Sequence, residues 1–308
     1  IVVKGQEHSK KNNIETAELK KYGGKLIFSS GEINFSSIDI INKEFNNINE
    51  QQIFFPSQFI KRHNIQNTKL INIIENIKKI KVCVIGDIII DEYVNCAPIG
   101  MSQEEPTLVI TPLSKTSFVG GAGVVAKNAI TQCKKVHLIS AIGKDSNSKI
   151  VFDNLKKTKI DKYILLDENR PTNLKQRFRA EDKSLLRVNT VSQLPISTDI
   201  QKKILKKINS IIKKIDLIIF SDFNYGLLPQ KLIDKIIEIA RKNKVFISAD
   251  SQSSSQIGDI SRFKDVDFMS PTEYEARIAL NDRESGLVVL AEKLRKKTNV
   301  KNIFLTLN

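Results

Sequence analysis

The 308-residue chain has a formal net charge of +15 and is 41% hydrophobic, which is enough apolar surface for one large or two ordinary globular domains. Its three cysteines form no Cys-x-x-Cys pair and its three histidines are isolated, so neither a disulfide framework nor a zinc site is expected. No apolar run approaches the roughly 20 residues that span a bilayer. The composition therefore predicts a cytoplasmic globular protein without a membrane partner.

The excess positive charge has two interpretations. Lysines that neutralise phosphates would indicate a nucleic-acid partner. The excess is mostly lysine, however, and the lysines recur as pairs along expected helices, as in Lys202-Lys203 and Lys206-Lys207. Such pairs are typical of a solvated helix face. We therefore expect no nucleic-acid partner.

The first zone, residues 1–48, is α/β in character. The chain begins at Ile1 with neither Met nor a signal-peptide pattern, so we interpret it as an interior piece of a longer protein. Residues 49–79 follow as an Asn-rich and Gln-rich linker that ends in a helix at about Thr68–Lys79. The elements expected in the first zone are strands at Ile1–Lys4 and Lys25–Phe28, a helix at Asn13–Tyr22 and a second helix from Ser36-Ser37.

In residues 80–308, apolar strands alternate with amphipathic helices. Continuous β-branched runs between helices are typical of a parallel sheet covered on both faces, so the fold class is α/β with a doubly wound parallel sheet. Glu92–Val119 and Thr172–Val188 break the alternation and predict a small β lid. The expected strands are Val82–Ile85, Val136–Ala141, Leu217–Phe220, Val245–Ala249, Phe268–Met269 and Ile303–Leu307; the expected helices are Ala122–Gln132, Asn147–Lys157, Asp199–Lys214, Gln230–Lys242, Glu273–Ala279 and Ser285–Thr298.

Four carboxylates follow expected strands of this sheet: Asp87, Asp91, Asp222 and Asp250. In a doubly wound sheet, ligands bind in the crevice outside the carboxyl ends of the strands. Each acid alone is equally well explained as a cap of the following helix or turn. The set of four favours a polyol ligand, because carboxylates accept hydrogen bonds from neighbouring hydroxyl groups.

Two further features suit a polar or anionic ligand. Gly120-Gly121 permits close approach of the backbone and a positive φ before a helix, although such a pair is more often a plain turn. Lys175, Arg177, Arg179 and Arg187 form a basic cluster on the expected lid, which suits phosphate or hydroxyl recognition or is a solvated strand face.

A glutamate also stands at the start of an expected helix. Glu275 follows Pro271-Thr272 directly after a strand. It either stabilises the helix N-terminus or organises magnesium-bound water near a nucleotide.

The order of these motifs carries a family resemblance over residues 81–308. The chain resembles the ribokinase-like (PfkB) carbohydrate kinases, and is most similar to the kinase part of the bifunctional heptose-phosphate kinase/nucleotidyltransferases of lipopolysaccharide biosynthesis. The family's Asn before the motif glutamate is Thr272 here, and a lysine expected before Gly226 is Tyr225. The motifs are Gly86-Asp87-x3-Asp91, Gly120-Gly121-Ala122 with Asn128, Lys175-x-Arg177, Ser221-Asp222-Phe223-x2-Gly226 and Pro271-x3-Glu275.

The resemblance implies a kinase that uses ATP and Mg²⁺, and possible pairing of two copies through their lids. It also implies that the general-base Asp lies beyond Asn308, so residues 1–308 alone are expected to be inactive. Glu275 would reach the metal through water. The implied sugar-binding residues are Asp87, Asp91, Gly120, Gly121, Asn128 and Asp222, with Lys175 and Arg177 closing over the sugar, and the implied nucleotide-binding residues are Asp250, Thr272 and Glu275.

The first zone resembles the C-terminal end of a cytidylyltransferase-like nucleotidyltransferase. The matching segments are Val3-Lys4-Gly5, Tyr22-Gly23-Gly24 and Phe35-Ser36-Ser37. The resemblance implies that Ser36 and Ser37 bind a nucleotide phosphate, although Ser36 is equally an N-cap residue.

The sequence therefore predicts ATP-dependent phosphorylation of a sugar or sugar phosphate in a bifunctional protein that makes nucleotide-activated sugars for a surface glycan. A noncatalytic sugar-binding or interaction module built on the kinase fold is the alternative. A nicotinamide-dependent Rossmann enzyme is disfavoured, because Ile85-Gly86-Asp87 lacks the Gly-x-Gly-x-x-Gly spacing directly after its strand.

Overall fold

The computed structural model describes residues 2–5, 16, 19–21, 23–29, 56–181, 183–253 and 258–307. The chain divides into two compact units, Ile1–Gln66 and Asn67–Asn308. In the first unit, β1 (Val2–Gly5) and β2 (Leu26–Ser29) each lie within one residue of a predicted strand, and the two pair in parallel. The helix α3 (Ser57–Arg62) lies in the predicted linker. The helix predicted from Ser36-Ser37 lies outside the described residues, and so does most of the one predicted at residues 13–22.

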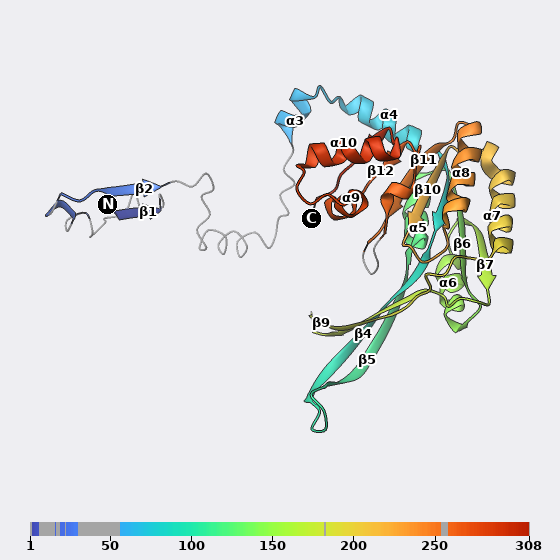
Figure 1. Cartoon of the computed structure of the whole chain (residues 1–308), viewed down its shortest axis with the longest axis horizontal. Coiled ribbons are helices and arrows are strands. Elements are labelled where there is room, and N and C mark those ends of the chain that lie inside the picture. The colour runs from blue at the N-terminus through green and yellow to red at the C-terminus, as the bar shows by residue number, and fades with distance from the viewer. Residues whose placement is uncertain are drawn as a thin grey trace. The chain divides into compact units, whose positions relative to one another are not determined.

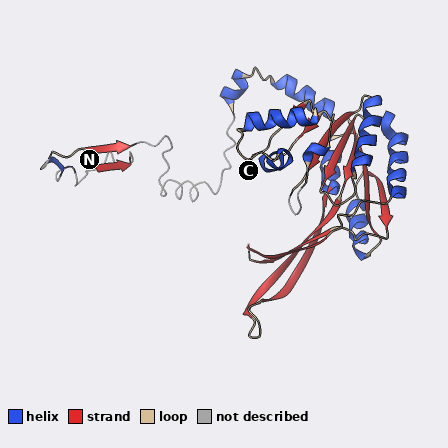
Figure 2. Cartoon of the chain, in the orientation of Figure 1, coloured by secondary structure: helices blue, strands red, loops and turns tan. Residues whose placement is uncertain are grey.

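In the described part of the second unit, seven parallel strands form a central sheet in the order β13-β12-β11-β10-β3-β6-β7 (Figures 1 and 2). The chain runs outward from β3 to β7 and then returns to β10, beside β3. The order of the strands therefore reverses between the neighbours β3 and β10, and their carboxyl ends form the topological switch point of a doubly wound sheet. The strands are β3 (Lys81–Gly86), β6 (Lys135–Gly143), β7 (Asp161–Asp167), β10 (Leu217–Asp222), β11 (Phe246–Ser251), β12 (Phe268–Met269) and β13 (Asn302–Ile303).

Helices cover both faces of this sheet, because its strands are apolar on both sides. In β3, Val82 and Val84 pack in one buried cluster with α5 and α6, whereas Cys83 and Ile85 pack in the opposite cluster with α7 and α8. The helices are α4 (Asn67–Ile77), α5 (Ala122–Gln132), α6 (Ser146–Lys156), α7 (Thr198–Ile211), α8 (Gln230–Lys242), α9 (Glu273–Leu280) and α10 (Leu287–Thr298), with 3-10 turns η2 (Ile212–Lys214) and η3 (Ile260–Arg262).

A second, four-stranded sheet forms the lid, with the order β5-β4-β8-β9. Its strands are β4 (Ile88–Met101), β5 (Leu108–Gly121), β8 (Leu174–Ala180) and β9 (Lys183–Thr190). The β4 strand pairs in parallel with β8, and the other two pairings are antiparallel. Only Asp87 separates β3 from β4, so the lid grows directly from the switch point and extends away from the central sheet (Figure 1).

The predicted α/β fold with a β lid is confirmed, with three local differences. The strand β7 was not predicted, because its polar start Asp161-Lys162 hides the apolar run that follows. The strand predicted at Ile303–Leu307 is reduced to Asn302–Ile303 and one bridge between Thr272 and Thr306. Asp91 lies inside β4 rather than at a strand exit. Within the described residues, no helix is long and apolar enough to cross a membrane.

Candidate functional site

Asp87 occupies the switch point and is 1% exposed. Its main-chain N–H donates to the carbonyl of Ser221 at 3.1 Å, which ties β3 to the end of β10. Its Oδ2 accepts the main-chain N–H groups of Phe223 at 3.0 Å and Tyr225 at 3.4 Å. The carboxylate therefore holds the loop after β10. A buried position of this kind does not favour direct contact with a sugar, so that role of Asp87 remains a prediction.

Burial raises the pKa of Asp87 from 3.8 to about 6, and the neighbouring charge of Asp222 adds to the increase. The loop N–H groups and the guanidinium of Arg170 oppose it. Arg170 is itself buried and donates to the carbonyl of Tyr225. Sequence reasoning missed Arg170, which follows the unpredicted strand β7. Arg170 thus ties the loop after β10 to the segment that follows β7.

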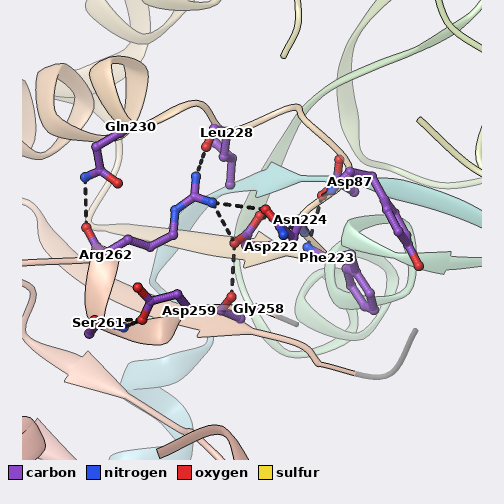
Figure 3. Close-up of polar contacts among 12 residues, drawn as sticks. Asp87, Asp222, Phe223, Asn224, Leu228, Gln230, Gly258, Asp259, Ser261 and Arg262 are labelled. Carbon is purple, nitrogen blue, oxygen red and sulfur yellow. Dashed lines mark hydrogen bonds and ion pairs between the residues drawn. The ribbon is translucent and has the colours of Figure 1, made fainter. Parts of the chain in front are cut away.

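Asp222, at the end of β10, is also 1% exposed. It accepts the Ser251 hydroxyl at 3.0 Å and the main-chain N–H of Asn224 at 3.1 Å. Arg262, from η3, reaches toward it with Nη1 at 3.7 Å and also donates to the Leu228 carbonyl and the Asn224 side chain (Figure 3). Burial raises the pKa of Asp222, and Arg262 opposes the increase. Asp222 thus anchors the loop between β10 and α8.

The residues predicted for the nucleotide side form a second group of contacts. Thr272 caps α9 and makes a reciprocal capping box with Glu275, which is the structural alternative that the sequence left open. The Oε1 of buried Glu275 accepts the main-chain N–H of Ser253 at 2.9 Å. Asp250 is half-buried and accepts the Gln252 side chain at 2.9 Å. Its pKa is raised by burial, and also by the charges of Glu275 and Asp222.

These contacts limit how Glu275 could organise magnesium-bound water, the role predicted for it. Both oxygens of Glu275 already accept main-chain N–H groups, from Ser253 and Thr272. Among the residues that the structure describes, no group of three or more His, Cys, Asp or Glu side chains is placed to hold a metal ion. The described side chains therefore do not form a magnesium site by themselves.

The two glycines before α5 are required by their surroundings. Gly121 has a φ of +58°, as the sequence led us to expect, and a Cβ there would lie 2.2 Å from the carbonyl oxygen of Asp87. A Cβ on Gly120 would lie 2.2 Å from Oδ2 of Asp91. Gly121 therefore allows α5 to start against the switch point, and Gly120 leaves room for the Asp91 carboxylate.

At the base of the lid, Asp91 faces a pocket of about 570 Å³. Arg177 and Arg179 contribute to its wall, and their guanidinium carbons lie 5.5 and 5.9 Å from the ring centroid of Tyr93. Alternation along a strand places Asp91 and Tyr93 on one face, so this contribution of Tyr93 was open to prediction. The lining residues are Asp91, Tyr93, Phe118, Val119, Gly120, Val124, Arg177 and Arg179.

Lys175 connects this pocket to the switch point. It is opposite Asp91 in the β4–β8 register and is 8% exposed. Its Nζ lies 5.4 Å from the ring centroid of Phe223 and 5.3 Å from that of Tyr225, both in the loop after β10. The structure thus brings together Asp91, Gly120, Lys175 and Arg177 of the predicted sugar site.

Asn128 is not brought to this pocket. It is exposed on α5, and its carbonyl accepts the Thr131 hydroxyl. The residue of α5 that lines the pocket is Val124, one helical turn earlier. Ser36 and Ser37 lie outside the described residues.

The solved structures that share this fold include a ribokinase and a phosphofructokinase. The ribokinase of Giardia lamblia matches 75% of this chain and 74% of its own with a TM-score of 0.59 and 17% sequence identity. Phosphofructokinase-2 of Escherichia coli in complex with fructose-6-phosphate matches 74% of each chain with a TM-score of 0.58 and 12% identity. At such identities the likeness shows the ribokinase-like fold alone.

The family follows from the sequence comparison. The model of the pfkB family carbohydrate kinases matches residues 79–307, so the chain belongs to the pfkB family of carbohydrate kinases.

Curated relatives match over the same part. Bifunctional protein HldE of Aliarcobacter butzleri is 33% identical over 235 residues, which are 75% of this chain and 48% of that protein. The Helicobacter pylori strain G27 protein of the same name is 32% identical over 216 residues, 70% of this chain and 46% of its own. The chain thus spans about half the length of these relatives. The matches give no evidence on the nucleotidyltransferase resemblance of residues 1–48.

Proposed function

We propose that the protein transfers a phosphoryl group from ATP to a hydroxyl group of a sugar phosphate, and that the sugar has the size of a heptose. The observation that carries this proposal is the lid pocket, where one carboxylate and two arginines share a wall. Asp91 accepts hydrogen bonds from sugar hydroxyls. Arg177 and Arg179 bind the phosphate that the sugar already carries, because guanidinium groups match phosphate oxygens in pairs.

In this proposal the predicted site residues contact the sugar phosphate, hold the neighbouring loop or bind ATP. Asp91, Lys175 and Arg177 contact the sugar phosphate, with Gly120 leaving room for the Asp91 carboxylate. Asp87 and Asp222 hold the loop that closes the inner end of the site. ATP binds on the side of Asp250 and Thr272, at the carboxyl ends of β11 and β12, as expected for the crevice of a doubly wound sheet.

Calorimetry with the 308-residue chain tests sugar binding, and ADP release by the full-length protein tests phosphoryl transfer. The ligands are ribose, fructose 6-phosphate and a heptose with a terminal phosphate. The heptose phosphate is expected to bind most tightly, and Asp91→Ala is expected to weaken it at least tenfold. Binding without ADP release would favour a noncatalytic sugar-binding module. No binding to any of the three sugars would contradict both functions.

For the first unit we propose the end of a nucleotidyltransferase domain. The parallel β1–β2 pair suits an α/β domain, and the curated relatives carry the word bifunctional in their names. The full-length protein is then expected to join a nucleotide to a sugar 1-phosphate with release of pyrophosphate. Ser36→Ala combined with Ser37→Ala is expected to slow that reaction without changing ADP release by the kinase. Unchanged nucleotidyl transfer would contradict the assignment of this serine pair.

We also propose that two copies pair through their lids. Large apolar side chains are exposed along β4 and β5 of the lid, including Ile99, Met101 and Leu113. Exposed apolar patches of this kind mark interaction surfaces. Sedimentation is expected to show a dimer that Leu113→Glu dissociates, and a monomer at all concentrations would contradict the pairing.

A further inference from the structure

The Lys175 ammonium lies beside a pair of stacked aromatic rings, within 5.4 Å of both ring centroids. Phe223 and Tyr225 stack with an interplanar angle of 21° and centroids 6.3 Å apart, and Nζ of Lys175 is about equally far from both. Lys175 comes from the lid, whereas the two rings come from the loop after β10. A desolvated contact between a cation and a ring corresponds to roughly 5- to 30-fold in an equilibrium constant. This arrangement therefore fixes a lid cation against the central sheet.

The rings are themselves held by their main chain. Oδ2 of Asp87 accepts the N–H groups of both ring-bearing residues, and Arg170 donates to the Tyr225 carbonyl. Asn224 and Gly226 have positive φ values of 58° and 81°, so the loop turns sharply on either side of Tyr225. The position of the rings is thus set by the switch point, independently of Lys175.

Tyr225 is the more buried of the two ring-bearing residues. It is 1% exposed. A lysine there would bring a second ammonium group toward Lys175 and the buried Arg170, in a place where burial makes like charges costly. Tyrosine supplies the face of a ring instead, which attracts the existing cation.

We propose that Phe223 and Tyr225 are positioning residues that hold the Lys175 ammonium beside Asp91, where it meets the anionic sugar ligand. The inference rests on the proposed function for the ligand and on the observed contacts for the positioning.

A double-mutant cycle on Tyr225 and Lys175 tests the positioning. Binding of a heptose with a terminal phosphate is measured by calorimetry for the wild type, Tyr225→Leu, Lys175→Met and the double variant. Tyr225→Leu is expected to weaken binding about tenfold, and Tyr225→Phe, which keeps the ring, by less than about twofold. In the Lys175→Met background, Tyr225→Leu is expected to change affinity by less than about twofold. An equal loss in both backgrounds would overturn the inference, because a merely structural tyrosine acts regardless of Lys175.

The same four proteins are unfolded with urea in the absence of any sugar. The shift of the urea midpoint caused by Tyr225→Leu is expected to be smaller when residue 175 is Met. An equal shift in both backgrounds would overturn the contact. If no variant binds the sugar, the proposed function fails while this unfolding cycle still decides the contact. If Tyr225→Leu does not fold, Phe223→Leu at the half-buried ring replaces it in both cycles.

Discussion

The acids at the switch point and the acid in the lid pocket have opposite surroundings. Asp87 and Asp222 are buried, and their oxygens accept main-chain N–H groups of the loop that follows β10. Asp91 is half-buried and faces a pocket with two arginines in its wall. Carboxylates of equal appearance in the sequence therefore have different surroundings: Asp87 and Asp222 hold the loop through its main chain, whereas Asp91 faces a pocket, which is why we propose it as the acid that contacts the ligand.

The largest expected effect is a loss of stability in Asp87→Ala. The substitution leaves the N–H groups of Phe223 and Tyr225 without their acceptor and removes one of the two negative charges near the Arg170 guanidinium, the other being Asp167. Unpaired buried groups of this kind cost roughly 2–5 kcal/mol of unfolding free energy. Urea unfolding followed by circular dichroism measures the loss.

Asp91→Ala is the matched control for this comparison. It is expected to change the unfolding free energy by less than about 1 kcal/mol, as for a residue outside the buried network, and to lower sugar-phosphate affinity. If the two alanine variants lost equal stability, the division between structural and ligand-facing acids would be wrong.

The pH dependence of stability gives the second prediction. Since the folded-state pKa of Asp87, about 6, lies above its ordinary value of 3.8, the folded protein holds this proton more tightly. Stabilisation from the proton is complete below about pH 3.8 and is lost as the pH rises through about 6. At about 1.4 kcal/mol per pKa unit, the loss is about 3 kcal/mol.

Asp87→Asn cannot titrate at this position and keeps one oxygen acceptor. The stability difference between the wild type and Asp87→Asn is therefore expected to change between pH 4 and pH 6 and to be flat above pH 7. Urea unfolding at a series of pH values measures it. A difference that stays constant over the whole range would show that Asp87 does not carry the raised pKa.

Most of the fold was predictable because hydrophobic periodicity is strong in this chain. The predicted bounds of α5 and α8 agree with the structure at both ends, since Gly121 and Pro229 mark the two starts and each helix carries an apolar stripe. The strand β7 was missed because its residues are only half-buried at the sheet edge, where the apolar signal is weak. Pairing of distant strands, such as β8 beside β4, is a tertiary contact that no local pattern contains.

The candidate site was predictable only in part. Asp91, Gly120 and Arg177 of the predicted sugar site line one pocket, and Lys175 is opposite Asp91 in the strand register, but their role in sugar binding stays a prediction. Motif order could not separate buried from accessible acids, because the main-chain partners of Asp87 lie more than 130 residues away in the sequence. The role of Arg170 was equally hidden, since its partner is a main-chain carbonyl and not a side chain.

The third prediction concerns the two glycines before α5, one beside the switch-point acid Asp87 and one beside the pocket acid Asp91. Gly121→Ala forces a positive φ on alanine and drives its Cβ against the Asp87 carbonyl, so a loss of roughly 1–3 kcal/mol or more is expected. Gly120→Ala meets only the end of the Asp91 side chain, which can rotate away. It is expected to cost less stability and to weaken sugar-phosphate binding. Unfolding and calorimetry on both variants measure the two effects, and the reverse ranking of stability would contradict the geometry.

The smallest expected effect concerns Asn128, which the family resemblance assigns to the sugar. Because its side chain is exposed on α5 and the pocket is lined by Val124 instead, Asn128→Ala is expected to change sugar-phosphate affinity by less than about twofold, or roughly 0.4 kcal/mol. Val124→Phe adds a ring to the pocket wall and is expected to weaken binding severalfold by occupying part of its volume. Calorimetry on the two variants compares adjacent turns of one helix. A strong loss in Asn128→Ala with no effect of Val124→Phe would mean that the sugar lies further along α5 than the lid pocket, and that Asp91 is not the acid that contacts it.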